Sequence, residues 1–137
     1  MKRLAYKILL SLIILAFGIM PLPQAAGTAF ETISAERSAT LIEKHKGNSN
    51  FVIIDVRTPQ EFKAGHIEDS ALIDYYSKNY LKELNALDKN KTYLIYCRSG
   101  NRSLRTLDMI KEMGFKKVYN MDRGLIGWHA GGYRTVN

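Results

Sequence analysis

The sequence predicts an α/β domain in which a mostly parallel central sheet is flanked by helices on both faces. Two observations predict this class. Segments with the pattern of strands alternate with segments with the pattern of helices, which is typical of parallel sheets. Residues 51–56 form a nearly continuous apolar run, as expected for a parallel strand buried on both faces. A chain of 137 residues is long enough for one such domain with one hydrophobic core.

Caps and turns mark the first elements. Ser34 can cap a helix that runs to about residue 45. After the strand at 51–56, the segment Thr58-Pro59-Gln60-Glu61 forms a capping box with proline at the first helical position. A short helix therefore begins there, and Gly65 ends it.

The later elements continue the alternation of strands and helices. We expect a short strand at 71–73, a helix at 77–86, a strand at 92–96, a helix at 103–113 and a strand at 117–121. Gly114 suits the end of the helix at 103–113, because glycine adopts the left-handed conformation that often terminates a helix.

Residues 1–27 have the pattern of an export signal. Basic residues precede an apolar stretch at 8–20, and small residues suit cleavage after Gly27 or after Ala29. The apolar stretch is shorter than the about 20 residues that a membrane-spanning helix needs. We therefore expect a cleaved signal, and an uncleaved membrane anchor is the alternative.

The expected product is an exported, periplasmic chain in which residues 28–32 are a short linker and residues 33–137 are the functional domain. Any contact with a membrane would be limited to the N-terminal segment, if that segment stayed uncleaved.

The charge balance is mildly basic. The chain has 20 Lys and Arg residues against 13 Asp and Glu residues, a net charge of +7, and part of this excess lies in the expected signal. The remaining positive charge is spread along the chain rather than gathered in a run. This pattern does not indicate nucleic-acid binding, and it modestly favours small anionic substrates.

The only cysteine, Cys97, follows the expected strand at 92–96 and opens a short basic loop that leads into the helix at 103–113. Loop N–H groups and the positive end of the helix dipole would converge there and form a cradle for an anion. The same field lowers the pKa of a thiol and favours the nucleophilic thiolate. Lone cysteines are often small buried hydrophobes, but open α/β sheets bind their ligands at the ends of strands.

Export sharpens this interpretation of Cys97. Proteins in an oxidising compartment usually pair their thiols, and this chain offers Cys97 no internal partner. A leftover cysteine indicates a reactive thiol or an intermolecular bridge. A thiol redox protein is disfavoured, because a second, resolving cysteine is missing.

Three segments resemble the signatures of the rhodanese family, in the expected order. Residues 55–67 (Asp55-Val56-Arg57-Thr58-Pro59-Gln60-Glu61-Phe62-Lys63-Ala64-Gly65-His66-Ile67) resemble the N-terminal signature, and Cys97-Arg98-Ser99-Gly100-Asn101-Arg102-Ser103 resembles the active-site loop. Gly124-Leu125-Ile126-Gly127-Trp128, followed by Gly131-Gly132, resembles the C-terminal signature. The similarity covers about residues 33–135, so the chain resembles a small, exported, single-domain rhodanese.

The resemblance implies a sulfurtransferase that acts through a cysteine persulfide. Cys97 would attack the outer sulfur of thiosulfate, release sulfite and pass the sulfur to cyanide or a thiol, or to a protein acceptor. The loop would bind the anionic donor, with charge from Arg98 and Arg102; its substrate-binding residues would be Arg98, Ser99, Gly100, Asn101, Arg102 and Ser103. The resemblance implies neither a metal nor an organic cofactor, and His45 and His129 show no metal-ligand spacing.

One spacing separates this reaction from phosphate chemistry. Cysteine phosphatases place an arginine after a cysteine and five intervening residues, where this chain has Ser103. Here Arg102 comes one position earlier, and the tighter loop suits the smaller sulfane sulfur. We therefore expect no phosphatase or arsenate reductase activity, and we expect Ser103 to cap the helix that it opens.

Residues outside the loop are expected to have structural roles near the site. Asp55 would pair with an arginine such as Arg57 or with loop N–H groups, because a buried carboxylate needs a partner. His66 is not needed as a base, since a preformed thiolate attacks thiosulfate without one.

The segment after the N-terminal signature departs from the family pattern. Many rhodaneses carry Gly-Ala there, whereas this chain has Glu68-Asp69-Ser70-Ala71, followed by a tyrosine-rich stretch. Tyr75, Tyr76 and Tyr80 would line the rim of the pocket or pack within the domain. The departure leaves the acceptor open, and a partner-fed sulfur carrier with little turnover of free thiosulfate is the alternative function.

Overall fold

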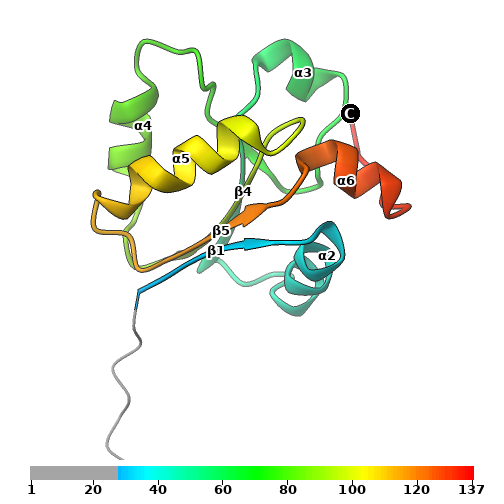
Figure 1. Cartoon of the computed structure of the whole chain (residues 1–137), viewed down its shortest axis with the longest axis horizontal. Coiled ribbons are helices and arrows are strands. Elements are labelled where there is room, and N and C mark those ends of the chain that lie inside the picture. Colours follow the sequence, from blue (N-terminus) through cyan, green and yellow to red (C-terminus); the bar gives the residue numbers. More distant parts are fainter. Residues whose placement is uncertain (1–27) are drawn as a thin grey trace, which may run out of the picture.

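The structure, a computed structural model, describes residues 28–137 (Figure 1). The expected export signal, residues 1–27, lies outside the described residues. Across residues 28–137, no helix combines the length and the apolarity needed to cross a membrane. In chain order the elements are β1 (Ala29–Ile33), α2 (Ala35–Lys44), β2 (Phe51–Asp55), α3 (Pro59–Lys63), β3 (Ala71–Leu72), α4 (Tyr80–Ala86), β4 (Thr92–Tyr96), α5 (Asn101–Lys111), β5 (Lys117–Met121) and α6 (Gly124–Ala130).

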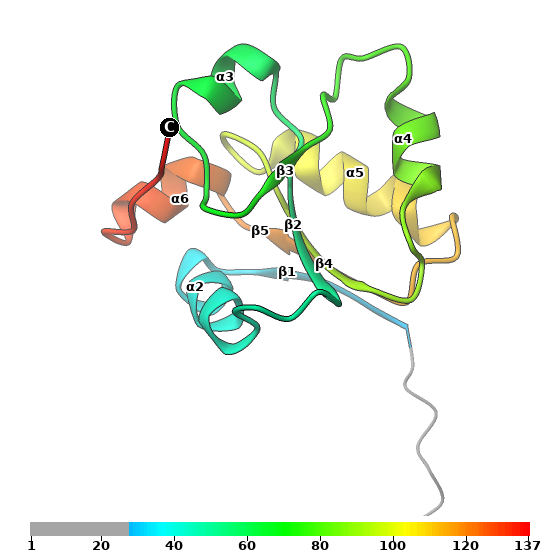
Figure 2. The ribbon, with the colours of Figure 1, turned by 180° about the vertical axis from the view of Figure 1, so that it is seen from behind.

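The five strands form one parallel sheet in the order β1-β5-β4-β2-β3. Helices α4 and α5 cover one face, and helices α2 and α6 cover the other (Figure 2). The predicted fold class is therefore confirmed. Strand β4 lies in the middle, with β2 and β5 as its neighbours, so its carboxyl end opens at the centre of one edge of the sheet.

Strand β4 supplies both halves of the core, because its successive side chains point to opposite faces. Tyr93 and Ile95 pack under α4 and α5, in the same cluster as Cys97. Leu94 and Tyr96 pack against α2 and α6 on the other face. All are buried, which is the pattern of a parallel strand covered on both sides.

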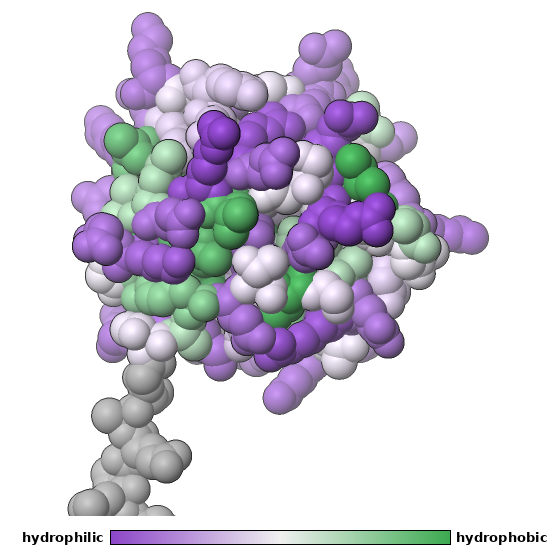
Figure 3. All heavy atoms as spheres, viewed as in Figure 1, coloured by the Kyte–Doolittle hydropathy of each residue, from purple (hydrophilic) through white to green (hydrophobic). Residues whose placement is uncertain are grey.

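Hydrophilic side chains cover most of the face shown in Figure 3, and apolar areas lie between them. The large hydrophobic residues exposed in the described part of the chain are Tyr76, Leu81, Leu104, Met109, Ile126 and Val136.

Residues 29–33 form strand β1, so the predicted linker at 28–32 is wrong. β1 pairs along its whole length with β5, from Ala29 beside Lys117 to Ile33 beside Met121. Its main chain also bonds to the residues that flank β5, since Ala29 N–H donates to the Lys116 carbonyl and Asp122 N–H donates to the Ile33 carbonyl, both at 2.8 Å. The domain therefore begins before residue 33.

The helix caps confirm two predicted starts. The Ser34 side chain accepts a bond from Arg37 N–H at 3.1 Å and caps α2. In α3, Thr58 accepts from Glu61 N–H at 3.3 Å while the Glu61 carboxylate accepts from Thr58 N–H at 3.0 Å, which completes the predicted capping box.

Two other predicted helices begin elsewhere, and one helix was missed. Helix α5 begins at Asn101 with Gly100 as its cap, so Ser103 lies inside the first turn and does not cap the helix. Helix α4 begins at Tyr80 rather than at residue 77. Helix α6, over 124–130, was not predicted at all.

Asp55 and Arg57 form a buried ion pair where β2 ends. The Asp55 side chain is 0% exposed and that of Arg57 is 6% exposed. Arg57 Nη2 donates to Asp55 Oδ2 and to the Gly65 carbonyl, each at 2.6 Å, and the Arg57 N–H donates to Asp55 Oδ1 at 2.9 Å. The pair therefore joins the end of β2 to the segment that follows α3.

We expect Arg57→Ala to lower the free energy of unfolding by about 3–5 kcal/mol, because it leaves the buried Asp55 carboxylate without its partner. Urea denaturation measures the change. The matched control is Arg37→Ala, since Arg37 pairs with Glu31 at the surface, and this substitution should change the free energy of unfolding far less. Equal effects of the two substitutions would contradict the role of the buried pair.

Candidate active site

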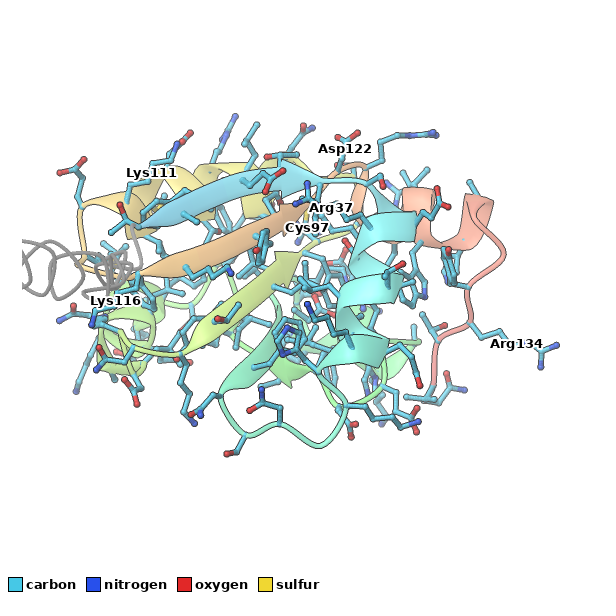
Figure 4. The ribbon with its side chains drawn as sticks, turned by 90° about the horizontal axis from the view of Figure 1, so that it is seen from below. Arg37, Cys97, Lys111, Lys116, Asp122 and Arg134 are labelled. Carbon is cyan, nitrogen blue, oxygen red and sulfur yellow. The ribbon has the colours of Figure 1, made fainter. Side chains whose placement is uncertain are left out.

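Cys97 lies at the carboxyl end of the central strand β4 and is fully buried. Figure 4 shows Cys97 near the middle of the molecule, whereas Lys111 and Lys116 lie toward the end at the left of the view. Its sulfur faces the start of α5. Gly100 N–H donates to Cys97 Sγ at 3.1 Å, and the Ser103 hydroxyl lies 3.5 Å from Sγ.

Two opposing effects act on the pKa of Cys97. Burial raises the pKa, because it disfavours the charged thiolate. Hydrogen bonds from the Ser103 hydroxyl and from main-chain N–H groups of Ser99, Gly100 and Ser103 lower it. The bonds win, so the pKa lies below the ordinary value of a thiol. The first turn of α5 adds the positive end of its dipole in the same direction.

This arrangement suits a nucleophile that must hold negative charge before and after it reacts. Donors fixed by the fold need no reorganisation when charge moves on to a sulfur or oxygen atom beside them. The loop is therefore organised for an anion, and the Cys97 sulfur lies at its centre.

Hydrogen bonds from the start of α6 fix the shape of the loop. The carbonyl of Cys97 accepts from Leu125 N–H at 2.9 Å, and that of Arg98 accepts from Ile126 N–H at 3.0 Å. The start of α6 thus satisfies the loop carbonyls on one side, which leaves the loop N–H groups free to face the sulfur.

This contact requires glycine at position 124. Gly124 has a φ of +48°, and a Cβ there would lie 2.2 Å from the Cys97 carbonyl oxygen. Gly100 has a φ of +93°, and a Cβ there would lie 3.0 Å from Arg123 N. Two backbones approach closely only because both residues lack side chains. Gly124 lies in the C-terminal family signature, but the sequence did not predict this role, and its local signal is a glycine three residues after the strand at 117–121.

Arg102 is paired rather than free. Its guanidinium donates to Glu61 in a bidentate pair, with Nη2 2.7 Å from Oε1 and Nη1 2.9 Å from Oε2. Bonds from Arg102 hold the pKa of the Glu61 carboxyl at about 2, and Glu61 in turn raises the pKa of Arg102. From the sequence, Glu61 is predicted only as a capping residue.

The other predicted loop residues divide into an exposed and a buried set. The side chains of Arg98, Ser99 and Asn101 are exposed, whereas Gly100 and Ser103 are buried beside the sulfur. The structure therefore brings Cys97, Gly100 and Ser103 together and leaves Arg98 in solvent at the surface of the loop.

His66 contacts Phe62 and Val136 and is not part of the cluster around the Cys97 sulfur. Its ring stacks on Phe62 with centroids 3.8 Å apart, and its main chain bridges to Val136. Its Nδ1 lies 3.1 Å from the Phe62 carbonyl oxygen.

The predicted tyrosine cluster packs beside the first turn of α5. The Tyr80 hydroxyl lies 2.5 Å from Thr106 Oγ1, and the Tyr75 ring packs on Tyr80 and Tyr76 with centroids 5.1 and 5.3 Å apart. Tyr76 is exposed, and its ring centre lies 5.6 Å from the Arg102 guanidinium carbon. The cluster thus forms a rim next to Arg102 and also packs within the domain.

A cavity of about 590 Å³ lies on the other face of the sheet, between α2 and the segments at 67–69 and 133–134. Phe51, Ile53 and Trp128 contribute to its wall, and no residue of the loop at 97–103 does. It is therefore separate from the site of Cys97. In the part of the chain that the structure describes, no group of three or more His, Cys, Asp or Glu side chains could hold a metal ion.

The rhodanese-like domain family matches residues 38–131. The chain belongs to the rhodanese family. The resemblance predicted from the three sequence segments is thus confirmed, and the match includes Cys97 and its loop.

Curated relatives agree with this assignment. The chain is 34% identical over 93 residues to the putative sulfurtransferase YtwF of Bacillus subtilis, which covers 68% of this chain and 87% of the relative. It is 32% identical over 104 residues to the thiosulfate sulfurtransferase GlpE of Pseudomonas syringae, which covers 75% of this chain and 91% of the relative. These relatives support sulfurtransferase activity in general.

Solved structures share the fold. A rhodanese-related protein from Thermoplasma volcanium superposes with a TM-score of 0.67 at 24% identity, over 78% of this chain and 98% of the other. A rhodanese-like domain protein from Staphylococcus aureus superposes with a TM-score of 0.60 at 28% identity, over 72% of this chain and 90% of the other.

We expect Gly124→Ala to lower the free energy of unfolding by more than about 2 kcal/mol, because its Cβ would collide with the Cys97 carbonyl as well as strain a positive φ. Urea denaturation measures the loss. Gly114→Ala is the control, since Gly114 also has a positive φ but a Cβ there would meet open space; we expect it to cost about 1 kcal/mol. Similar losses in both variants would show that the close approach is unimportant.

We expect Ser103→Ala to raise the pKa of Cys97, because it removes a hydrogen bond that favours the thiolate. Alkylation by iodoacetamide, followed across pH, should reach its half-maximal rate at higher pH than in the unaltered protein. Ser38→Ala is the control, since Ser38 is an equally buried serine in α2, on the other face, and its hydroxyl donates to the Ser34 carbonyl. An unchanged pH profile in Ser103→Ala would remove Ser103 from the site.

Proposed function

We propose that this protein moves sulfane sulfur from thiosulfate or a related donor to a thiophilic acceptor, such as cyanide or a thiol, through a persulfide on Cys97. One observation carries the proposal: the Cys97 sulfur lies among the N–H groups and the hydroxyl that begin α5, and its pKa is lowered there. The name of the relative GlpE, a thiosulfate sulfurtransferase, supports thiosulfate as the donor.

In the first step the Cys97 thiolate attacks the outer sulfur of thiosulfate. A bond forms between the two sulfur atoms as the sulfur–sulfur bond of thiosulfate breaks, and sulfite leaves with the electron pair. The negative charge then lies on the outer sulfur of the Cys97 persulfide, where the N–H groups of the loop stabilise it.

In the second step an acceptor takes the outer sulfur. Cyanide or a thiolate attacks it, the persulfide bond breaks, and the electron pair returns to Cys97 as thiolate. The donors that lower the pKa of Cys97 also make it a better leaving group, since a lower pKa speeds the departure of a thiolate. The cycle needs neither an oxidant nor a metal in its balance.

We further propose that the protein is exported to the periplasm after removal of an N-terminal signal. The basic start, the apolar stretch at 8–20 and the small residues that follow support this proposal. An isolated thiol would serve a persulfide carrier there, because it has no internal cysteine with which to form a disulfide.

The test is the intact mass of the purified protein before and after thiosulfate. We expect a gain of one sulfur atom that is lost on adding cyanide, and the starting mass shows where the chain has been cleaved. Cys97→Ser, which keeps the size of the side chain but removes the thiol, should gain nothing.

Sulfur transfer that persists in Cys97→Ser would contradict the mechanism. A wild-type protein that gains no sulfur from thiosulfate, but gains it from a partner protein, would instead establish the partner-fed carrier.

A further inference from the structure

Arg102, which the sequence predicted to attract an anionic donor, is already neutralised by a carboxylate. Arg102, in the first turn of α5, forms its bidentate pair with Glu61 of α3, across the mouth of the loop. The side chains of Arg102 and Glu61 are 18% and 28% exposed. Salt screens such a pair less than it screens charges in open solvent.

Glu61 is fixed in this position by more than Arg102. Its Oε2 also accepts from Thr58 N–H at 3.0 Å and lies 3.1 Å from Thr58 Oγ1, within the capping box of α3. The pKa of the carboxyl is about 2, so Glu61 stays ionised throughout the physiological range and the pair persists.

The positive charge near Cys97 is therefore smaller than the two arginines of the loop suggest in the sequence. Of the two arginines in the loop, Arg102 is cancelled by Glu61, and Arg98 is exposed, where water screens its charge. What remains near Cys97 is a set of dipoles, the N–H groups and the start of α5. These donors match the single negative charge of a thiolate or persulfide on Cys97, whereas the second charge of thiosulfate would need a cation that Arg102, paired with Glu61, does not supply.

The rim beside this pair is aromatic. Tyr76 lies against the Arg102 guanidinium, and Tyr75 packs between Tyr76 and Tyr80. Aromatic rings offer an apolar surface to an organic group, which a sulfonate group cannot use.

We propose that Glu61 is a specificity-determining residue that, by neutralising Arg102, turns the site away from the thiosulfate dianion and toward organic persulfides with one negative charge. This inference rests on the proposed function, because it assumes that Cys97 takes sulfane sulfur. With such a donor, the Cys97 thiolate attacks the terminal sulfur of the ionised persulfide R–S–S⁻, the sulfur–sulfur bond breaks, and the thiolate R–S⁻ leaves with the electron pair. Cys97 then carries the ionised persulfide S–S⁻, and no other reactant is needed.

The test compares the rates at which thiosulfate and cysteine persulfide load Cys97, followed by intact mass. It uses the wild-type chain and Glu61→Gln. Glutamine retains the cap of α3 and can still accept a bond from Arg102, but it carries no charge. The control is Glu112→Gln, which changes the net charge equally at the far, C-terminal end of α5.

We expect wild type to be loaded faster by cysteine persulfide than by thiosulfate. In Glu61→Gln, the rate with thiosulfate should rise roughly 3- to 10-fold relative to the rate with cysteine persulfide. This gain should shrink as salt is added, and Glu112→Gln should leave the ratio of the two rates at its wild-type value.

A second variant covers the case in which Glu61→Gln does not fold. Arg102→Gln leaves the Glu61 charge unbalanced, so loading by thiosulfate should fall more than loading by cysteine persulfide. An unchanged ratio in the folded variants, while wild type still forms the Cys97 persulfide, overturns this inference alone. A wild-type protein that gains sulfur from neither donor overturns the proposed function as well.

Discussion

A loop can point several N–H groups at one sulfur only if its carbonyl groups find donors elsewhere. In this protein the start of α6 supplies those donors, to the carbonyls of Cys97 and Arg98. The approach is so close that only glycine fits at position 124. The low pKa of Cys97, the position of Gly100 and the start of α5 all depend on this contact, because a loop with unsatisfied carbonyls would turn them toward solvent and lose its shape.

The site works chiefly through dipoles. Main-chain N–H groups and the Ser103 hydroxyl stabilise the thiolate at short range, while the Arg102 guanidinium is held in a pair with Glu61. The Asp55–Arg57 pair is likewise internally balanced and serves to join β2 to the end of α3. The ion pairs thus connect elements of the fold, and weaker, well-oriented groups surround the Cys97 sulfur.

Features that depend only on a few neighbouring residues could be predicted from the sequence. The capping box at Thr58 and Glu61, the buried strand at 51–56 and the loop after Cys97 are of this kind. Features that depend on distant partners could not. Residues 29–33 become a strand only because β5 pairs with them, and Glu61 meets Arg102 from 41 positions away. Ser103 looked like a cap because the positive φ of Gly100, which starts α5 earlier, is not visible in sequence.

The parallel sheet also sets where the chain enters the domain. Ala29 begins β1 at the amino end of the sheet, beside Lys117, whereas Cys97 follows the carboxyl end of β4. A strand of this length spans roughly 15–20 Å. The start of β1 and the Cys97 thiol therefore lie at opposite ends of the strands of the sheet. Any attachment made through the N-terminus would leave the mouth of the loop sterically open to an acceptor as large as another folded protein.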